Sequence, residues 1–297
     1  MNFTIHHTTS HRYERPVSFS NHRLFLFPVP SHRRAVRHFE VETHPASRQR
    51  WVRDVYGNAV LVCNFGLTES TELSFDTRIE LAMAADNPFD FVLEPYATSY
   101  PFEYTDMDKV ALVPYSSRLP AKDALNVLDW FRNAVSSTTE HPDVVQFLTE
   151  LNSAVRRDIS YVRRDEEGIQ TPDETLRLRA GSCRDMAVLF IAAVRQLGFA
   201  GRFVSGYLYD PAVAGGAPSE HVFNRAVGSM HAWAEVYLPG AGWKGFDPTN
   251  GVLVGQDHVR VACGRNYGDA TPTSGTLYKG GGGEKLEVEV RVEELDG

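Results

Sequence analysis

Residues 181–187 read Gly-Ser-Cys-Arg-Asp-Met-Ala, and they open the most clearly helical stretch of the chain. Apolar side chains then recur every three to four residues until Gly198 provides a stop signal. We predict a helix over 183–197 with Ser182 as its N-cap. A helix N-terminus carries partial positive charge and free N–H groups, which lower the pKa of a thiol and can stabilise an oxyanion. Position alone leaves Cys183 either a nucleophile or a buried structural cysteine.

Two strand patterns further along the chain offer partners for this thiol. Residues 231–238 read His-Ala-Trp-Ala-Glu-Val-Tyr-Leu, and their odd-numbered side chains share one face because side chains alternate along a strand. A Pro-Gly-Ala-Gly turn follows, and the returning strand reaches Asp247. If the hairpin loop holds an odd number of residues, His231 and Asp247 project together as adjacent or diagonal neighbours. Asp247 would then orient the imidazole while its other nitrogen faces Cys183.

The rest of the chain divides into a β-rich and a mixed part. The first 115 residues combine short apolar runs, a period-two pattern over 72–81 and Pro, Gly and Asn turn signals, which favour a β-sandwich-like unit. Helical periodicity begins near residue 120, and strands return after residue 198. We therefore predict an α+β fold with an N-terminal β-rich domain, 1–115, and a catalytic core, 116–297, of helices packed on an antiparallel sheet. The first helical stripe comprises Leu125, Leu128, Phe131 and Val135.

Composition excludes several classes of protein. The 297 residues hold 30 Lys and Arg against 38 Asp and Glu, a net charge of −8 that argues against a nucleic-acid binder. Residues 1–55 hold nine arginines and four acidic residues, which we interpret as an exposed β surface, with nucleic-acid binding as the alternative. Three cysteines cannot form a disulfide framework and fit a reducing compartment. The N-terminus lacks a signal-peptide pattern, and the apolar stretch Met186–Val194 is far below the ~20 residues of a membrane span. We expect a cytoplasmic protein that binds neither nucleic acid nor membrane.

No cofactor or metal is expected. The chain contains no H-E-x-x-H pair, EF-hand loop or C-x-x-C motif. Its Gly-rich segment 280–285 lacks the spacing of a phosphate-binding loop. His6, His7 and His11 are metal-ligating residue types, but an edge strand near the terminus is the simpler interpretation.

The core motifs resemble those of the bacterial transglutaminase-like superfamily. The matching segments are Gly-Ser-Cys-Arg-Asp-Met-Ala (181–187), Gly-Arg-Phe-Val-Ser-Gly-Tyr-Leu (201–208), His-Ala-Trp-Ala-Glu-Val-Tyr (231–237) and Gly-Trp-Lys-Gly-Phe-Asp-Pro-Thr (242–249). The first half resembles the β-rich domain that precedes this core in the bacterial branch. The segments that carry this second likeness are 12–17, 54–58 and, after the core motifs, 257–267. The resemblance spans nearly the whole chain, and it implies a papain-like core with a Cys-His-Asp triad.

Carried over by position, the resemblance makes Cys183 the nucleophile, His231 the general base and acid, and Asp247 the residue that orients the imidazole. Arg184 stands where many relatives have Gln. Its guanidinium would favour the thiolate, bind an acidic substrate group, or point to solvent. The remaining candidates for contact with the substrate or the oxyanion are Ser182, Tyr161 and Trp233.

The resulting hypothesis is thiol-dependent acyl transfer on a peptide or protein substrate. A thioester forms on the cysteine, and water or an amine then resolves it. Hydrolysis of a peptide or isopeptide bond is the first choice, in keeping with the description of such proteins as cysteine proteases. The alternatives are an amine-accepting transglutaminase that cross-links proteins, and a non-catalytic peptide-binding scaffold on the same fold.

Overall fold

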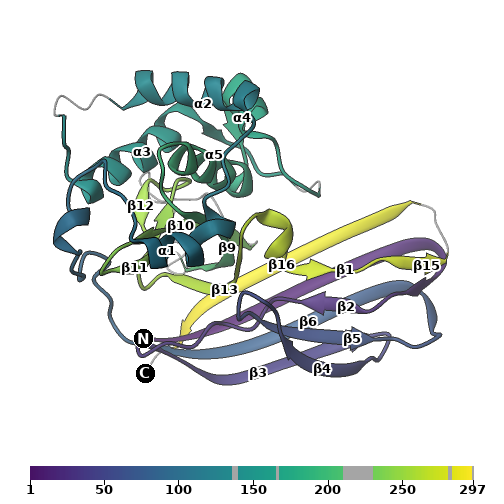
Figure 1. The fold of residues 1–297 in the computed structure, drawn as a ribbon. Coiled ribbons are helices and arrows are strands. Elements are labelled where there is room, and N and C mark those ends of the chain that lie inside the picture. Colours follow the sequence, from purple (N-terminus) through teal and green to yellow (C-terminus); the bar gives the residue numbers. More distant parts are fainter. Residues whose placement is uncertain (136–139, 165–166, 210–229, 280–282, 296–297) are drawn as a thin grey trace, which may run out of the picture.

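In the computed structural model the chain folds into two lobes, a β lobe and a core lobe in which helices cover a sheet (Figure 1). This arrangement confirms the predicted α+β fold. None of the helices in the described part of the chain is long and apolar enough to cross a membrane. The structure describes residues 1–135, 140–164, 167–209, 230–279 and 283–295.

The β lobe consists of two antiparallel sheets, as the alternating sequence patterns predict. In β1, every second side chain from Phe3 to Thr9 is buried, because one face of the strand packs inward and the other meets solvent. The first sheet runs β15-β1-β6-β3, with β16 also paired to β1, and the second runs β14-β2-β5-β4. The strands are β1 (Asn2–Phe19), β2 (His22–Leu24), β3 (Arg34–His44), β4 (Arg48–Arg53), β5 (Ala59–Asn64), β6 (Glu69–Met83), β14 (Thr273–Ser274), β15 (Leu277–Lys279) and β16 (Glu284–Leu295).

The last strands of the chain return to the β lobe. β16 pairs antiparallel with β1 along nearly its whole length, from Asn2 opposite Leu295 to Tyr13 opposite Glu284. β14 and β15 likewise pair with β2 and β1. The predicted assignment of all of 116–297 to the catalytic core is therefore wrong for its C-terminal strands, which complete the sheets of the β lobe. The boundary near residue 115 stays a prediction.

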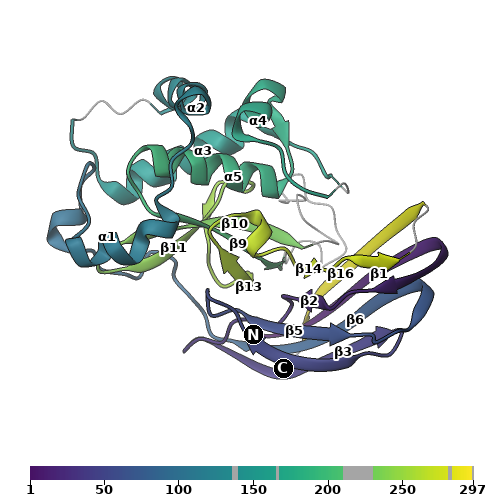
Figure 2. The same ribbon diagram turned by 45° about the vertical axis from the view of Figure 1, so that its right-hand side comes forward.

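The core lobe has a sheet in the order β12-β11-β10-β9-β13, and the helices over residues 121–196 gather on one side of that sheet (Figure 2). The strands are β9 (Gly201–Leu208), β10 (His231–Leu238), β11 (Gly242–Asp247), β12 (Val252–Leu253) and β13 (His258–Gly264), beside a short parallel pair, β7 (Ser160–Tyr161) and β8 (Ala180–Gly181). The helices are α1 (Asp106–Leu112), α2 (Ala121–Ala134), α3 (Val144–Asp158), α4 (Pro172–Leu178) and α5 (Cys183–Gln196), with 3₁₀ turns at Pro95–Ala97, Val113–Tyr115 and Tyr267–Asp269.

The β lobe forms hydrogen bonds with the outer edge of β13. The Arg34 guanidinium donates to the carbonyl of His258 (2.7 Å), and the Val29 N–H donates to the carbonyl of Arg260 (2.8 Å). Asn58 pairs with both backbone groups of Cys263, accepting from its N–H at 2.9 Å and donating to its carbonyl at 2.7 Å. These contacts satisfy backbone groups that an edge strand would otherwise expose, so they fix the β lobe against the core sheet.

Candidate active site

The start of α5 places Cys183 in the interior of the protein. α5 begins at Cys183, Ser182 precedes it in extended conformation as the N-cap, and Gly198 follows the helix with φ of 95°. The helix predicted from the sequence is thus confirmed to within one residue at its C-terminal end. Cys183 is buried, with 7% of its surface exposed. The backbone N–H groups of a first helical turn have no partner within the helix, so they remain available beside the sulfur.

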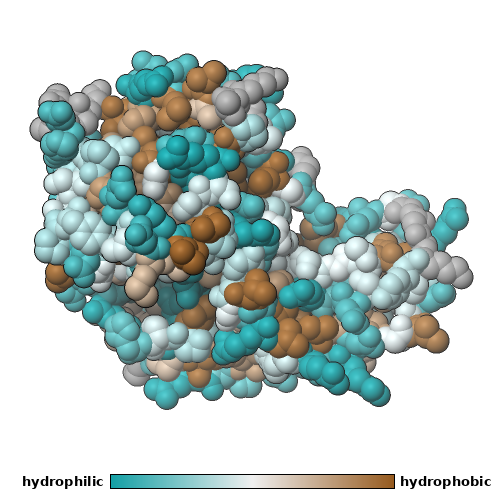
Figure 3. Space-filling view, in the orientation of Figure 1, coloured by the Kyte–Doolittle hydropathy of each residue, from teal (hydrophilic) through white to brown (hydrophobic). Residues whose placement is uncertain are grey.

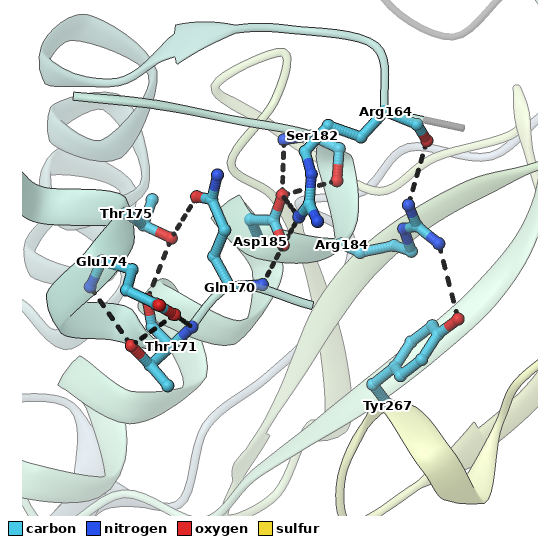
Figure 4. A network of polar contacts seen from close by, with 9 residues as sticks. All are labelled: Arg164, Gln170, Thr171, Glu174, Thr175, Ser182, Arg184, Asp185 and Tyr267. Carbon is cyan, nitrogen blue, oxygen red and sulfur yellow. Dashed lines mark hydrogen bonds and ion pairs between the residues drawn. The ribbon is translucent and has the colours of Figure 1, made fainter. Parts of the chain in front are cut away.

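Asp185 holds this helix start in place. Its carboxylate accepts hydrogen bonds from the backbone N–H and hydroxyl of Ser182, both at 2.8 Å, and from the backbone N–H of Gln170 at 2.7 Å. The Arg164 guanidinium adds an ion pair at 2.9 Å (Figure 4). Burial would raise the pKa of Asp185, but these hydrogen bonds outweigh it and lower the pKa. A charged carboxylate therefore fixes the turn that presents Cys183.

The hairpin of β10 and β11 brings His231 and Asp247 together. Leu238 lies opposite Gly242 in the strand register, so the loop between them has odd length, as assumed. Continuing that register makes His231 and Asp247 diagonal neighbours on one face. Nε2 of His231 lies 2.8 Å from Oδ2 of Asp247, and both side chains are completely buried.

Both oxygens of the Asp247 carboxylate accept several hydrogen bonds. Its Oδ1 accepts the backbone N–H groups of Thr249 (2.9 Å) and Asn250 (3.2 Å). Its Oδ2 accepts from His231, from the Asn250 amide (2.7 Å) and from Nε2 of His258 (3.1 Å). Burial would raise the pKa of Asp247, but the charge and hydrogen bond of His231, together with the hydrogen bond from His258, hold it far below its usual range. Asp247 is therefore an anion.

The electrostatics of His231 fit a base between a carboxylate and a thiol. Burial lowers the pKa of His231, but the charge and hydrogen bond of Asp247, together with the Cys183 thiol, outweigh it and raise the pKa to about 10. Its Nδ1 is buried and has no nitrogen or oxygen partner among the described residues. Nε2 thus faces the carboxylate, and Nδ1 is left for the thiol.

A cavity of about 730 Å³ opens onto Cys183 and His231. It lies where the two lobes meet, and the outline of the molecule is indented where the β lobe joins the core lobe (Figure 3). One wall comes from the core lobe and the other from β1 and β16. The β-lobe wall includes His7, His11, Tyr13, Glu284 and Leu286.

The other residues predicted to contact the substrate or the oxyanion do not all line the cavity in the same way. Tyr161 and Arg184 line the cavity. The Arg184 guanidinium donates to the carbonyl of Arg164 at 3.0 Å and to the hydroxyl of Tyr267 at 3.4 Å, so it forms part of the wall and does not point to open solvent (Figure 4). Ser182 also lines the cavity, but its hydroxyl donates its proton to Asp185. This hydrogen bond stabilises the start of the helix.

Trp233 lies in β10 as the sequence predicts, but it does not line the cavity. Its side chain is 1% exposed, lies outside the cavity lining and packs with Val204 and Cys263. The ring sits against Gly206, where an added Cβ would come within 2.5 Å of it. The expectation that Trp233 contacts a substrate is therefore wrong.

The three histidines of the N-terminal segment each have a different hydrogen-bond partner. His6 bonds Asp76, His7 bonds Tyr207, and His11 bonds Glu284.

Sequence reasoning missed two features of the site. The first is His258, whose segment matches the family but whose imidazole gave no separate signal. The second is the β-lobe wall, whose only trace in the sequence is the concentration of histidines before residue 50. Among the described residues, His231, Asp247 and His258 also offer three ligand atoms within 4.8 Å of one another. Both imidazole N–H groups already donate to the carboxylate, so a metal ion there would have to displace these hydrogen bonds.

The fold and site define a class, that of the thiol-dependent acyltransferases and proteases with a papain-like core. Residues 129–248 match the transglutaminase-like superfamily, and residues 3–82 match the bacterial transglutaminase-like N-terminal region. Rv2569c of Mycobacterium tuberculosis is 32% identical over 312 residues, which cover 99% of this chain and 93% of that protein. ML0607 of Mycobacterium leprae is 29% identical over 97% of each chain. The chain belongs to the transglutaminase-like superfamily.

A solved structure supports the same fold. A "putative cysteine protease" from Cytophaga hutchinsonii aligns with a TM-score of 0.70 over 100% of this chain and 91% of that one, at 17% sequence identity. At that identity the likeness extends to the fold alone. It covers both lobes.

Proposed function

We propose that this chain hydrolyses a peptide or isopeptide amide bond through a thioester on Cys183. The observation that carries the proposal is the buried His231–Asp247 pair. Its Nδ1 has no nitrogen or oxygen partner among the described residues, and the imidazole interacts with Cys183, a helix-start cysteine that lines a cavity. The family and the description of the Cytophaga hutchinsonii protein as a cysteine protease also support hydrolysis.

In the first half of the reaction Cys183 attacks the amide carbonyl. Because the pKa of His231 is raised, the thiol proton already lies on Nδ1 of His231 near neutral pH, and the Asp247 carboxylate stabilises this imidazolium beside the thiolate. The N–H groups at the start of α5 would stabilise the negative oxygen. His231 then gives its proton to the leaving amine, the C–N bond breaks, and the acyl group remains as a thioester.

In the second half water attacks the thioester. His231 takes one proton from the water through Nδ1 and returns it to the sulfur as the C–S bond breaks. The products are a carboxylic acid and the free thiol. If a primary amine replaces water, the same steps form a new amide, so the ratio of the two products distinguishes hydrolysis from cross-linking.

The decisive experiment compares the three cysteines of the folded protein. Burial raises the pKa of Cys63 and of Cys263, so iodoacetamide should label both slowly. Cys183 should react at least tenfold faster, and a thioester on Cys183 should be detected by mass spectrometry after incubation with a peptide library. C183A should form no adduct, and C263A, the matched control, should behave as the wild type. Equal slow labelling of all three cysteines and no adduct would favour a peptide-binding scaffold over an enzyme.

A further inference from the structure

A second imidazole shares the Asp247 carboxylate with the proposed base. His258 begins β13, and its Nε2 lies 3.1 Å from the same Oδ2 that binds His231 at 2.8 Å. The two rings are 6.1 Å apart, and the His258 side chain is 5% exposed. The carboxylate is thus held from two strands, by one residue in β10 and one in β13.

The proton positions follow from the hydrogen bonds. Because Asp247 is an anion, it can only accept, and Nε2 must carry the proton in both imidazoles. Nδ1 of His258 is buried and has no partner among the described residues. A proton there would leave a buried N–H donor without an acceptor, which is costly. His258 is therefore a neutral donor held in a single tautomer.

The surroundings hold His258 rigidly. Its backbone N–H donates to the carbonyl of Gly255 at 3.2 Å, and its carbonyl accepts from Arg34 of the β lobe at 2.7 Å. The Trp233 ring meets the imidazole edge-on at 5.3 Å. The position of the Asp247 carboxylate thus depends on a strand that the β lobe fixes.

We infer that His258 is a positioning residue that orients the Asp247 carboxylate toward His231. Its hydrogen bond also reduces the negative charge that the carboxylate presents to His231. The inference rests on the proposed function and extends it to a fourth residue. The titratable groups that face His231 are Cys183 from α5 and Asp247 from β11, with His258 acting through Asp247. Removing the His258 donor loosens the carboxylate, which slows the reaction. It also leaves more negative charge for His231, so the pKa of the imidazolium should rise.

The test measures iodoacetamide labelling of Cys183 against pH in full-length protein. H258L removes the donor, and H258M removes it with closer volume in case H258L fails to fold. H258Q keeps an N–H donor that can reach Oδ2. We expect about tenfold slower labelling near neutral pH in a donor-free variant, the order expected for one hydrogen bond to a charged group. The alkaline pH at which the labelling rate of Cys183 changes, which reports the pKa of His231, should be higher than in the wild type. H258Q should restore both the neutral-pH rate and this alkaline transition toward the wild-type values. If the role of His258 were purely structural, its replacement would lower the melting temperature without shifting the alkaline transition of Cys183 labelling.

Failure of this inference differs from failure of the proposed function. If wild-type Cys183 labels no faster than Cys63 and Cys263, the proposed function fails. If wild-type Cys183 is fast and a folded donor-free variant keeps the wild-type pH profile, the role of His258 is refuted. Nitrogen-15 NMR of the wild-type imidazoles gives an independent check that needs no variant. It should show the proton of His258 on Nε2, and a proton on Nδ1 would overturn the inference.

Discussion

Replacing Asp247 by Asn is an informative perturbation, because the structure dictates how the new amide must turn. Oδ1 faces two backbone N–H donors, those of Thr249 at 2.9 Å and Asn250 at 3.2 Å. The amide oxygen must occupy this position, because the two backbone donors cannot reverse, whereas the donors at Oδ2 can: the Asn250 amide can turn over, and each imidazole can carry its proton on Nδ1 instead. The NH₂ group therefore takes the Oδ2 position, 2.8 Å from Nε2 of His231.

The forced amide orientation reverses the tautomer of the base. With an N–H donor opposite, Nε2 of His231 must accept, and its proton moves to Nδ1. Nδ1 is the nitrogen that should take the proton from Cys183, so the base is blocked. The corresponding change in Ser-His-Asp enzymes lowers kcat about 10⁴-fold through the wrong tautomer. For D247N we expect a loss of roughly 10³–10⁴-fold in kcat/KM, by the same physical argument.

The assay combines turnover of a peptide identified from the Cys183 adduct with the iodoacetamide rate of Cys183. The matched control is D158N, because Asp158 is a hydrogen-bonded carboxylate in α3 that binds Arg157 and Trp130 and lies outside the cavity lining. D158N should retain wild-type turnover. A folded D247N protein whose turnover stays within tenfold of the wild type would refute the tautomer argument.

Three further predictions concern stability. The charged form of His231 stabilises the folded chain fully below pH 6.5, its ordinary pKa, and this contribution is lost as pH rises through about 10; unfolding by urea from pH 6 to 10 should show that decline in the wild type and not in D247N. G181A should destabilise the protein by about 1–3 kcal/mol, because the new Cβ would lie 2.9 Å from another side chain, whereas G268A, with nothing within 4 Å, should be close to neutral by the same measurement. N58A removes both hydrogen bonds to the Cys263 backbone, so we expect a loss of about 1–3 kcal/mol and a lower melting temperature; an unchanged value would mean that this contact does not fix the β lobe.

Within one helix or one hairpin, the sequence was sufficient to predict the geometry. The start of α5 at Cys183 follows from apolar periodicity and a capping residue, both of which are local. The shared face of His231 and Asp247 follows from strand alternation and an odd loop. Where periodicity leaves a choice, the sequence was less reliable. Leu125, predicted to be on the buried stripe of α2, is 58% exposed, and Val127 is buried in its place.

Only the tertiary structure decided which distant segments meet. The return of β16 to β1 joins the two ends of the chain. His258 reaches Asp247 although β10 and β9 separate the strands β13 and β11 in the sheet. The β lobe also supplies a cavity wall whose residues in β1 and β16 lie more than 100 positions from Cys183 in the sequence. Periodicity fixes which side chains share a face of one element, but contacts between elements depend on how those faces pack, and nothing local encodes that choice.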